Sequence, residues 1–276
     1  MAPSLHYEIN IMEIIGYIAS LFIGLSLGLI GGGGSILTVP VLVYLFGVDP
    51  VLATAYSLFI VGATSLVGAF PKYKNGDINL KTSIIFGIPS IIAVYATRAY
   101  LVPNIPQHIV QLGGLEITKP LLMMIVFAIL MVFASVSMIR NKCVDCDEDG
   151  PQVFNYPMIL LEGSVVGILT GFVGAGGGFL IIPALVLFSK LPMKKAIGTS
   201  LLIIAVKSLI GFTGDLGKQQ MDWTLLLSVT ALAVVGIFAG NALSKKISAD
   251  SLKKAFGWFV LVMGIYIIIK ELFLKS

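Results

Sequence analysis

The stretch "LGLIGGGGSILTVP" at residues 27–40 places four consecutive glycines inside an otherwise apolar segment. Each glycine in a helix interior costs about 1 kcal/mol relative to alanine. In a bilayer, the backbone groups that a helix break frees also need partners. The pattern returns in "GFVGAGGGFLIIP" at residues 171–183. The sequence therefore predicts two apolar segments that are each interrupted by a glycine-rich turn.

The composition is that of a membrane protein. Of the 276 residues, 57% are hydrophobic and only 12% are charged, whereas a soluble domain is about 25% charged. Apolar runs such as 82–102 and 258–269 are typical of membrane spans. We predict an all-α polytopic membrane protein in the lipid bilayer of the cell (inner) membrane, without a separate soluble domain.

The N-terminal residues and the net charge bear on processing and on binding partners. The first residues lack a positively charged n-region, so no cleaved signal peptide is expected. The net charge of +4 is modest and lies between the apolar segments. It therefore bears on membrane topology, and no nucleic-acid partner is expected.

The chain is predicted to be an internal duplication. Residues 24–68 align with residues 167–211 without a gap, and the alignment matches glycines, serines and a proline that apolar bias alone does not align. Examples are the pairs Gly31/Gly174, Pro40/Pro183 and Ser57/Ser200. The predicted parts are an N-terminal repeat (1–140), an acidic linker (141–156) and a C-terminal repeat (157–276).

Each repeat contains five apolar segments. They lie near 14–30, 36–47, 52–70, 82–101 and 120–139 in the first repeat, and near 158–173, 178–189, 196–213, 223–243 and 255–273 in the second. The second segment of each repeat is short: at 1.5 Å per residue it measures about 18 Å, less than a hydrocarbon core of about 30 Å. Each repeat is therefore expected to contain a glycine-broken helix or hairpin.

The distribution of Lys and Arg predicts how the repeats lie in the membrane. If the first two segments of each repeat form a re-entrant hairpin or two crossings, most basic residues fall on one face and the repeats are inverted. A single broken crossing would divide them evenly, which the positive-inside rule disfavours. We therefore expect both termini outside and the acidic linker in the cytoplasm. The count does not separate a hairpin from two crossings.

The glycine turns are predicted to form an anion site near mid-membrane. A helix that begins after a loop has unpaired N–H groups and a positive dipole end, and glycines let an anion approach them. Inverted repeats with broken helices place such ends at one central site. The alternative is that the glycines serve close helix packing. The candidate substrate-binding residues are Gly31, Gly32, Gly33, Gly34 and Ser35, with Gly174, Gly176, Gly177 and Gly178; Ser35 is expected to cap its helix or to donate its hydroxyl.

The third segments add side chains on one helical face. Ser57, Thr64 and Ser65 align with Ser200, Lys207 and Ser208. Lys207 falls near mid-depth, where a lysine is costly and points to function, so we interpret it as the counter-charge of a bound anion. The alternatives for Lys207 are snorkelling, or pairing with Asp215 or Glu162.

Other polar residues carry weaker predictions. Arg98 ends its segment, aligns with Asn241 and is expected to snorkel to the interface. Cys143 and Cys146 form a single Cys-x-x-Cys pair, and a zinc site would need two further ligands. We expect no catalytic residue, no metal and no cofactor. A membrane-bound enzyme that handles sulfur through the two cysteines remains an alternative.

Two blocks of the sequence resemble the TauE/SafE sulfite exporter family. They are "GLSLGLIGGGGSILTVPVL", with "ATAYSLFIVGATSLVGAF" after it, and "GILTGFVGAGGGFLIIPAL", with "AIGTSLLIIAVKSLIGF". The resemblance covers nearly the whole chain and implies a permease for sulfite, thiosulfate or organosulfonates. Lys207 departs from the pattern, since the resemblance implies an uncharged residue there; this favours another or a more highly charged anion. The hypothesis is a secondary transporter that exports a small sulfur oxyanion, and an anion channel is the alternative. Coupling and oligomeric state stay open.

Overall fold

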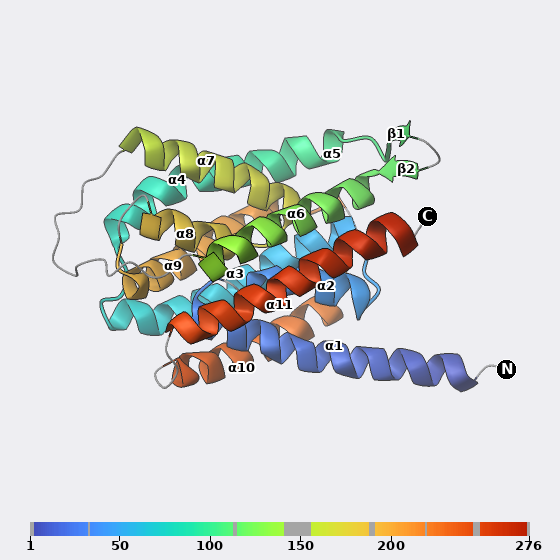
Figure 1. Ribbon diagram of the computed structural model, residues 1–276, viewed down its shortest axis with the longest axis horizontal. Helices are drawn as coiled ribbons and strands as arrows, with labels where there is room; N and C mark the ends of the chain where they lie inside the picture. The colour runs from blue at the N-terminus through green and yellow to red at the C-terminus, as the bar shows by residue number, and fades with distance from the viewer. Residues whose placement is uncertain are drawn as a thin grey trace.

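The computed structural model is a bundle of helices that run roughly along one axis (Figure 1). It describes residues 3–32, 34–112, 115–140, 156–187, 191–218, 220–244 and 249–274. Gly33, Cys143 and Cys146 lie outside the described residues, as does nearly all of the predicted acidic linker.

The helices follow the apolar segments. The first half contains α1 (Pro3–Ile30), α2 (Ser35–Tyr44), α3 (Pro50–Lys74), α4 (Leu80–Ala96), a π-helical turn η1 (Thr97–Leu101), α5 (Val102–Asn104), β1 (His108–Leu112), β2 (Leu115–Thr118) and α6 (Lys119–Arg140). The second half contains α7 (Tyr156–Val173), α8 (Gly178–Leu187), α9 (Met193–Thr213), α10 (Trp223–Leu243), α11 (Ala249–Ile269) and a π-helical turn η2 (Lys270–Leu274).

The prediction of an all-α polytopic membrane protein is confirmed. Among the described residues, six helices are long and apolar enough to cross a membrane. The spans are Ile11–Ile30, Pro50–Lys74, Leu80–Asn104, Lys119–Ser137, Lys194–Thr213 and Trp223–Leu243. By contrast, α2 and α8 have 10 residues each, about 15 Å of helix. Each short helix therefore covers only about half of the hydrocarbon core.

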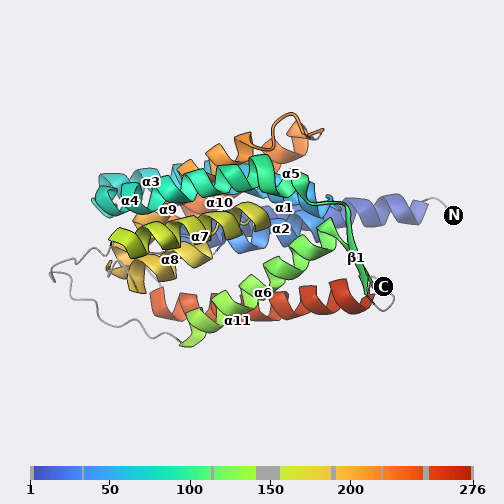
Figure 2. The ribbon, with the colours of Figure 1, turned by 90° about the horizontal axis from the view of Figure 1, so that it is seen from above.

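Most helix packing joins one half of the chain to the other. The helix α1 packs along α10, and its counterpart α7 packs along α4. The helix α3 packs against α9, and α6 against α11, a pair that lies along one side of the bundle in Figure 2. If every helix is replaced by its counterpart in the other half, the same set of packed helix pairs results: α1–α10 becomes α7–α4, and α3–α9 and α6–α11 are unchanged. The two halves therefore interleave in one bundle, and their inversion across the membrane stays a prediction.

One loop contact occurs twice in equivalent positions. The backbone N–H of Asp222 donates a hydrogen bond to the hydroxyl of Tyr56, and the backbone N–H of Asn79 donates to Oγ1 of Thr199 at 2.9 Å. Tyr56 corresponds to Thr199 in the sequence alignment, and continuing the same offset beyond the aligned residues pairs Asn79 with Asp222. Asn79 and Asp222 also cap the following helix with their side chains. The loop before α4 thus docks on α9 as the loop before α10 docks on α3.

The antiparallel hairpin of β1 and β2 was not predicted. It lies between α5 and α6, at the end of the bundle where α1 begins and α11 ends (Figure 1). Two adjacent glycines separate its two strands in the sequence, and such a pair is a hairpin signal. Its strands are short beside the apolar segments, so hydropathy alone did not find it.

Candidate functional site

The two glycine turns meet at the centre of the site. The helix α1 ends at Ile30 and the chain turns at Gly31, whose φ is +81°. The second turn follows α7 and has positive φ at Gly174, Gly176 and Gly177 (+74°, +63° and +74°), a conformation that other residues rarely adopt. A methyl group added to Gly32 would lie 2.6 Å from Cα of Gly178. The two turns therefore touch backbone to backbone.

This contact also brings together the starts of two short helices. The helices α2 and α8 begin at Ser35 and Gly178, close to the predicted segment starts near 36 and 178. The prediction that Ser35 caps α2 is wrong, because Gly34 occupies the cap position and makes no side-chain capping bond. The hydroxyl of Ser35 instead donates to the backbone oxygen of Gly32 at 2.8 Å, since Ser35 already lies in the first helical turn. Positive helix ends face the junction of the two turns.

Lys207 of α9 lies against the second turn. Its side chain is fully buried, and its Nζ donates a hydrogen bond to Oγ1 of Thr170 at 2.9 Å. A methyl group on Gly177 would lie 2.8 Å from this Nζ. In the described part of the chain, Lys207 forms no ion pair with Asp215, Glu162 or any other carboxylate. Lys207 therefore neither snorkels nor pairs, and Thr170 is a polar contact that the sequence analysis missed.

The predicted hydroxyl groups of α3 and α9 fall into two classes, although all of these side chains are buried. Thr64 donates to the backbone oxygen of Ile60 at 2.6 Å, and Ser200 to that of Ile197 at 2.8 Å. Within the described residues, the hydroxyls of Ser57, Ser65 and Ser208 have no hydrogen-bond partner. Buried hydroxyls normally have one. These three serines are therefore the hydroxyl groups that remain able to bind a ligand.

Arg98 is a second buried cation, and the sequence prediction that it snorkels is wrong. Its side chain is fully buried in η1. Its Nη1 lies 3.5 Å from Oδ2 of Asp215, and its Nη2 would lie 2.5 Å from a methyl group on Gly174. The π-helical turn and the packing of η1 on α7 turn the guanidinium inward, and such turns often mark functional sites.

The sequence did contain an indication that Arg98 is buried and functional. Its counterpart Asn241 is also polar and, in the structure, also has buried side-chain atoms without a hydrogen-bond partner among the described residues. A methyl group on Gly28 would lie 2.8 Å from the backbone nitrogen of Asn241. Polar residues at matching positions of two apolar segments therefore indicate a functional role. The contact between Arg98 and Gly174, however, is visible only in the tertiary structure.

Taken together, the groups that meet here are mainly hydrogen-bond donors. They include the ammonium of Lys207 beside Gly177, the guanidinium of Arg98 beside Gly174 and the helix starts after the glycine turns. That Ser57, Ser65 and Ser208 reach the same point stays a prediction. Cations and backbone N–H groups at helix starts are the groups that bind small oxyanions. The arrangement is therefore suited to a small anion that glycines allow to approach the backbone.

Comparison with known proteins agrees with this architecture. Residues 17–267 match the family model described as sulfite exporter TauE/SafE. A "probable membrane transporter protein" of Xylella fastidiosa is 31% identical over 89% of this chain and 91% of its own. A protein with the same description in Methanocaldococcus jannaschii is 26% identical over 98% of this chain and all of its own. YunE of Bacillus subtilis, also described as a probable membrane transporter protein, is 27% identical over 95% of this chain and 98% of its own.

These similarities extend over almost the whole chain, and the relatives are described as transporters rather than enzymes. The match to the family model includes both glycine turns, Arg98 and Lys207. The chain therefore belongs to the sulfite exporter TauE/SafE family of membrane proteins.

Proposed function

We propose that the protein is a secondary transporter that carries a small sulfur oxyanion, such as sulfite or an organosulfonate, out of the cell. The anion binds where the two glycine turns meet, with Lys207 as its counter-charge. Ser57, Ser65 and Ser208 supply hydroxyl donors, and the starts of α2 and α8 supply backbone donors. The description of the matched family as sulfite exporters supports the substrate class and the direction.

One observation carries the proposal: Lys207 is fully buried beside Gly177 and has no carboxylate partner among the described residues. An unpaired cation in a low-dielectric interior costs several kcal/mol. A bound anion offsets this cost. The single hydrogen bond to Thr170 holds the ammonium in place, and it leaves two of the three ammonium donors for a ligand.

The burial of Lys207 also favours a carrier over an open channel. Because its side chain has no exposed surface, a solute reaches the ammonium only after helices have moved. Such movement is the alternating access of carriers that are built from paired repeats. The interleaved packing of the two halves provides the helix pairs that would slide or rock against each other.

The membrane potential supplies a driving force for export. An inside-negative potential favours outward movement of an anion by about 2.3 kcal/mol per charge per 100 mV. A coupled cation is then unnecessary for net export. The proposed protein thus works as a uniporter whose direction follows the potential and the concentration gradient.

The test is transport by the purified protein in liposomes. Vesicles loaded with labelled sulfite, thiosulfate or sulfoacetate should release the label, and unlabelled anion outside should accelerate the release by exchange. Lys207→Ala should lower the rate at least tenfold, while Lys254→Ala, at the start of α11 and exposed, should leave it unchanged. A rate that is not accelerated by external anion would instead identify a channel, and equal rates for Lys207→Ala and wild type would remove Lys207 from the site.

The cysteine alternative has its own control. Cys143→Ser with Cys146→Ser should leave transport unchanged if the protein is a carrier. Loss of activity in this double variant, with normal insertion into the liposomes, would favour the membrane-bound enzyme.

A further inference from the structure

We propose that a cavity beside Arg98 is a second, outer binding site for the same sulfur oxyanion, and that Asp215 controls the passage between the glycine turns and this cavity. The inference rests on the proposed function. The cavity has a volume of about 330 Å³ and is lined by Lys119, Asp215 and Lys218 together with apolar residues that include Val51, Val102 and Met221. A space of this size accommodates a sulfonate with part of its hydration.

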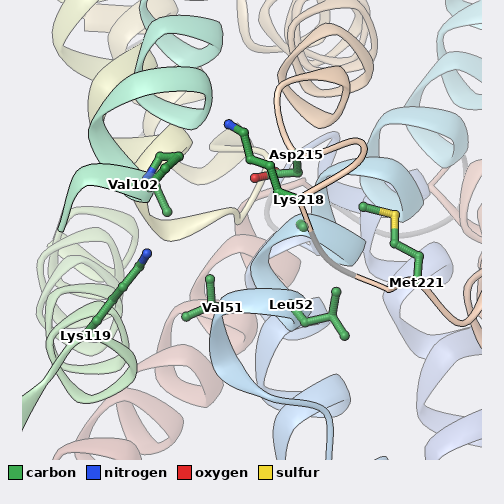
Figure 3. Close-up of a pocket in the computed structure, with 9 residues that line it drawn as sticks. Val51, Leu52, Val102, Lys119, Asp215, Lys218 and Met221 are labelled. Carbon is green, nitrogen blue, oxygen red and sulfur yellow. The ribbon is translucent and has the colours of Figure 1, made fainter. Parts of the chain in front are cut away.

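Four separate parts of the fold form the cavity. The start of α3 contributes Val51, α5 contributes Val102, the start of α6 contributes Lys119, and the α9–α10 loop contributes Asp215 and Lys218. Figure 3 shows Lys119 and Lys218 on different sides of the space, with Asp215 beside Lys218. The charge distribution that favours inverted repeats leaves Arg98, Lys119 and Lys218 together on the face with fewer basic residues. The structure brings these three residues to one place, although they are far apart in the sequence.

Positive charge predominates around the cavity. Lys119 is only 6% exposed, and the described residues contain no carboxylate in ion-pair distance of it. Lys218 Nζ donates to the backbone oxygens of Arg98 and Ala99, both at 3.0 Å. An ammonium has three donors, so one remains for a ligand. With Arg98, three cations surround the single lining carboxylate of Asp215.

The nearby carboxylate of Asp49 does not remove this excess. Its Oδ1 accepts hydrogen bonds from the backbone nitrogens of Val51 and Leu52, at 2.9 and 3.2 Å. It caps the start of α3 and keeps its negative charge, so it reduces the excess, but among the described residues the three cations Arg98, Lys119 and Lys218 still face only two carboxylates, Asp215 and Asp49. The cavity keeps a net positive charge, and its apolar walls strengthen the attraction for an anion because they exclude part of the water.

Arg98 connects this cavity to the glycine turns. One end of its guanidinium pairs with Asp215, which lines the cavity, and the other end lies beside Gly174 of the second turn. The pair with Asp215 is long, at 3.5 Å, and no nitrogen of the guanidinium has a hydrogen-bond partner among the described residues. Guanidinium groups bind oxyanions through two parallel hydrogen bonds. An anion that arrives from the glycine turn can therefore replace Asp215 as the partner of Arg98.

This replacement assigns separate roles to the charged groups. During export, Arg98 takes the anion over from the glycine turn, and Lys119 and Lys218 hold it in the cavity before it is released. Asp215 holds Arg98 when no anion is present and competes with the anion for it. Removing the carboxylate should therefore tighten binding in the cavity, whereas removing either lysine should weaken it.

Trp223, the first residue of α10, offers a probe near the cavity because it follows closely after Met221, which lines the cavity. The chain has only one other tryptophan, Trp258. In a Trp258→Phe background, fluorescence during titration with methanesulfonate or sulfite reports binding near the loop. We expect Lys119→Gln and Lys218→Gln each to weaken binding about tenfold, and Asp215→Asn to strengthen it. Lys254→Gln, which removes an equal charge from the exposed start of α11, should not change it.

A Lys207→Ala variant separates this inference from the proposed function. In this variant transport should be lost while the fluorescence titration persists, because the outer site does not need Lys207. If the wild type transports no sulfur oxyanion, the proposed function fails whatever the titration shows. Suppose that the wild type does transport the anion. The outer site is then overturned if Lys119→Gln and Lys218→Gln bind methanesulfonate as tightly as Lys254→Gln does. It is also overturned if Lys207→Ala abolishes the fluorescence change on titration.

Discussion

Gly32 and Gly178 lie backbone against backbone, with no room for a side chain on either residue. A methyl group on Gly32 would contact Cα, C and O of Gly178 at 2.6, 2.7 and 2.8 Å. Backbone atoms cannot move aside as the end of a flexible side chain can. The site thus depends on both residues being glycine, for reasons of space and not only of conformation.

Gly32→Ala and Gly178→Ala are therefore expected to separate the two turns. Both variants should lose most of the transport rate in liposomes and should melt at a lower temperature, because overpacking costs about 1–3 kcal/mol. Gly87→Ala is the matched control, since Gly87 lies inside α4 with no atom within 4 Å of an added methyl group. That variant should melt at the same or a higher temperature, by the roughly 0.5–1 kcal/mol that alanine adds to a helix interior. Normal transport by Gly32→Ala would show that the turns need not touch.

Lys207→Met should stabilise the protein while it abolishes transport. Methionine fills a similar volume without a charge, and replacing buried charges by apolar side chains is often stabilising by about 1–4 kcal/mol. The melting temperature of the purified variant should rise, and the further rise that sulfite gives to the wild type should disappear. A structural lysine would behave in the opposite way: its removal would lower the melting temperature and leave the effect of sulfite intact.

Thr170→Val should impair the site without removing its charge. The variant deletes the hydrogen bond that Lys207 Nζ donates to Oγ1 of Thr170 at 2.9 Å. Hydrogen bonds to charged groups contribute about 1.5–3 kcal/mol, so we expect the KM for transport to rise at least tenfold. Thr170→Ser keeps the hydroxyl and should restore the KM. If both variants transport like the wild type, Thr170 does not position Lys207.

The sequence allowed the broken helices to be predicted because their signals are local. Apolar runs gave the helices, and adjacent glycines gave the breaks before Ser35 and Gly178. The charge of Lys207 in an apolar segment was also a local signal. Arg98 was misinterpreted because a basic residue near the end of a span usually snorkels, and only packing against α7 and the α9–α10 loop turns it inward. Ser35 was misplaced by one residue, which is enough to change a cap into an internal hydrogen bond.

Tyr56→Phe and Thr199→Val should destabilise the protein to similar extents. Each removes the acceptor for a loop N–H, that of Asp222 in one case and that of Asn79 in the other. Both loop N–H groups are partly buried, and the net contribution of such a hydrogen bond is about 0.5–1.5 kcal/mol, so the melting temperature should fall. Because the two contacts are equivalent under exchange of the halves, a large fall in one variant alone would argue against equivalent docking of the two loops.

Each of these variants has a control in its own helix. Tyr73→Phe in α3 alters a tyrosine that is 59% exposed. Thr213→Val in α9 alters a threonine whose hydroxyl bonds only within its own helix, to Ile210. Neither change should alter the free energy of unfolding by more than about 0.5 kcal/mol, the usual limit for surface substitutions, so the melting temperature should stay nearly constant.

Asp215 should make binding in the outer cavity depend on pH. Burial raises the pKa of the Asp215 carboxyl above its ordinary value, although Arg98, Lys218 and Lys119 oppose this shift. As the pH falls from neutral, Asp215 is therefore protonated at a higher pH than an exposed aspartate. Its loss of charge increases the excess of positive charge around the cavity, so the affinity for methanesulfonate, whose own charge is constant, should increase as the pH falls. Trp223 fluorescence titrations at a series of pH values measure this affinity.

The same shift predicts the sign of a stability change. Because the folded protein binds this proton more tightly than the unfolded chain does, the contribution of Asp215 to stability should increase as the pH falls through its raised pKa. The contribution is complete below the ordinary pKa of aspartate and is lost as the pH rises. Asp215→Asn cannot titrate, so the difference in melting temperature between wild type and variant should change across this range. Parallel curves for the two proteins, in both melting temperature and methanesulfonate affinity, would show that the Asp215 carboxyl does not titrate in the cavity.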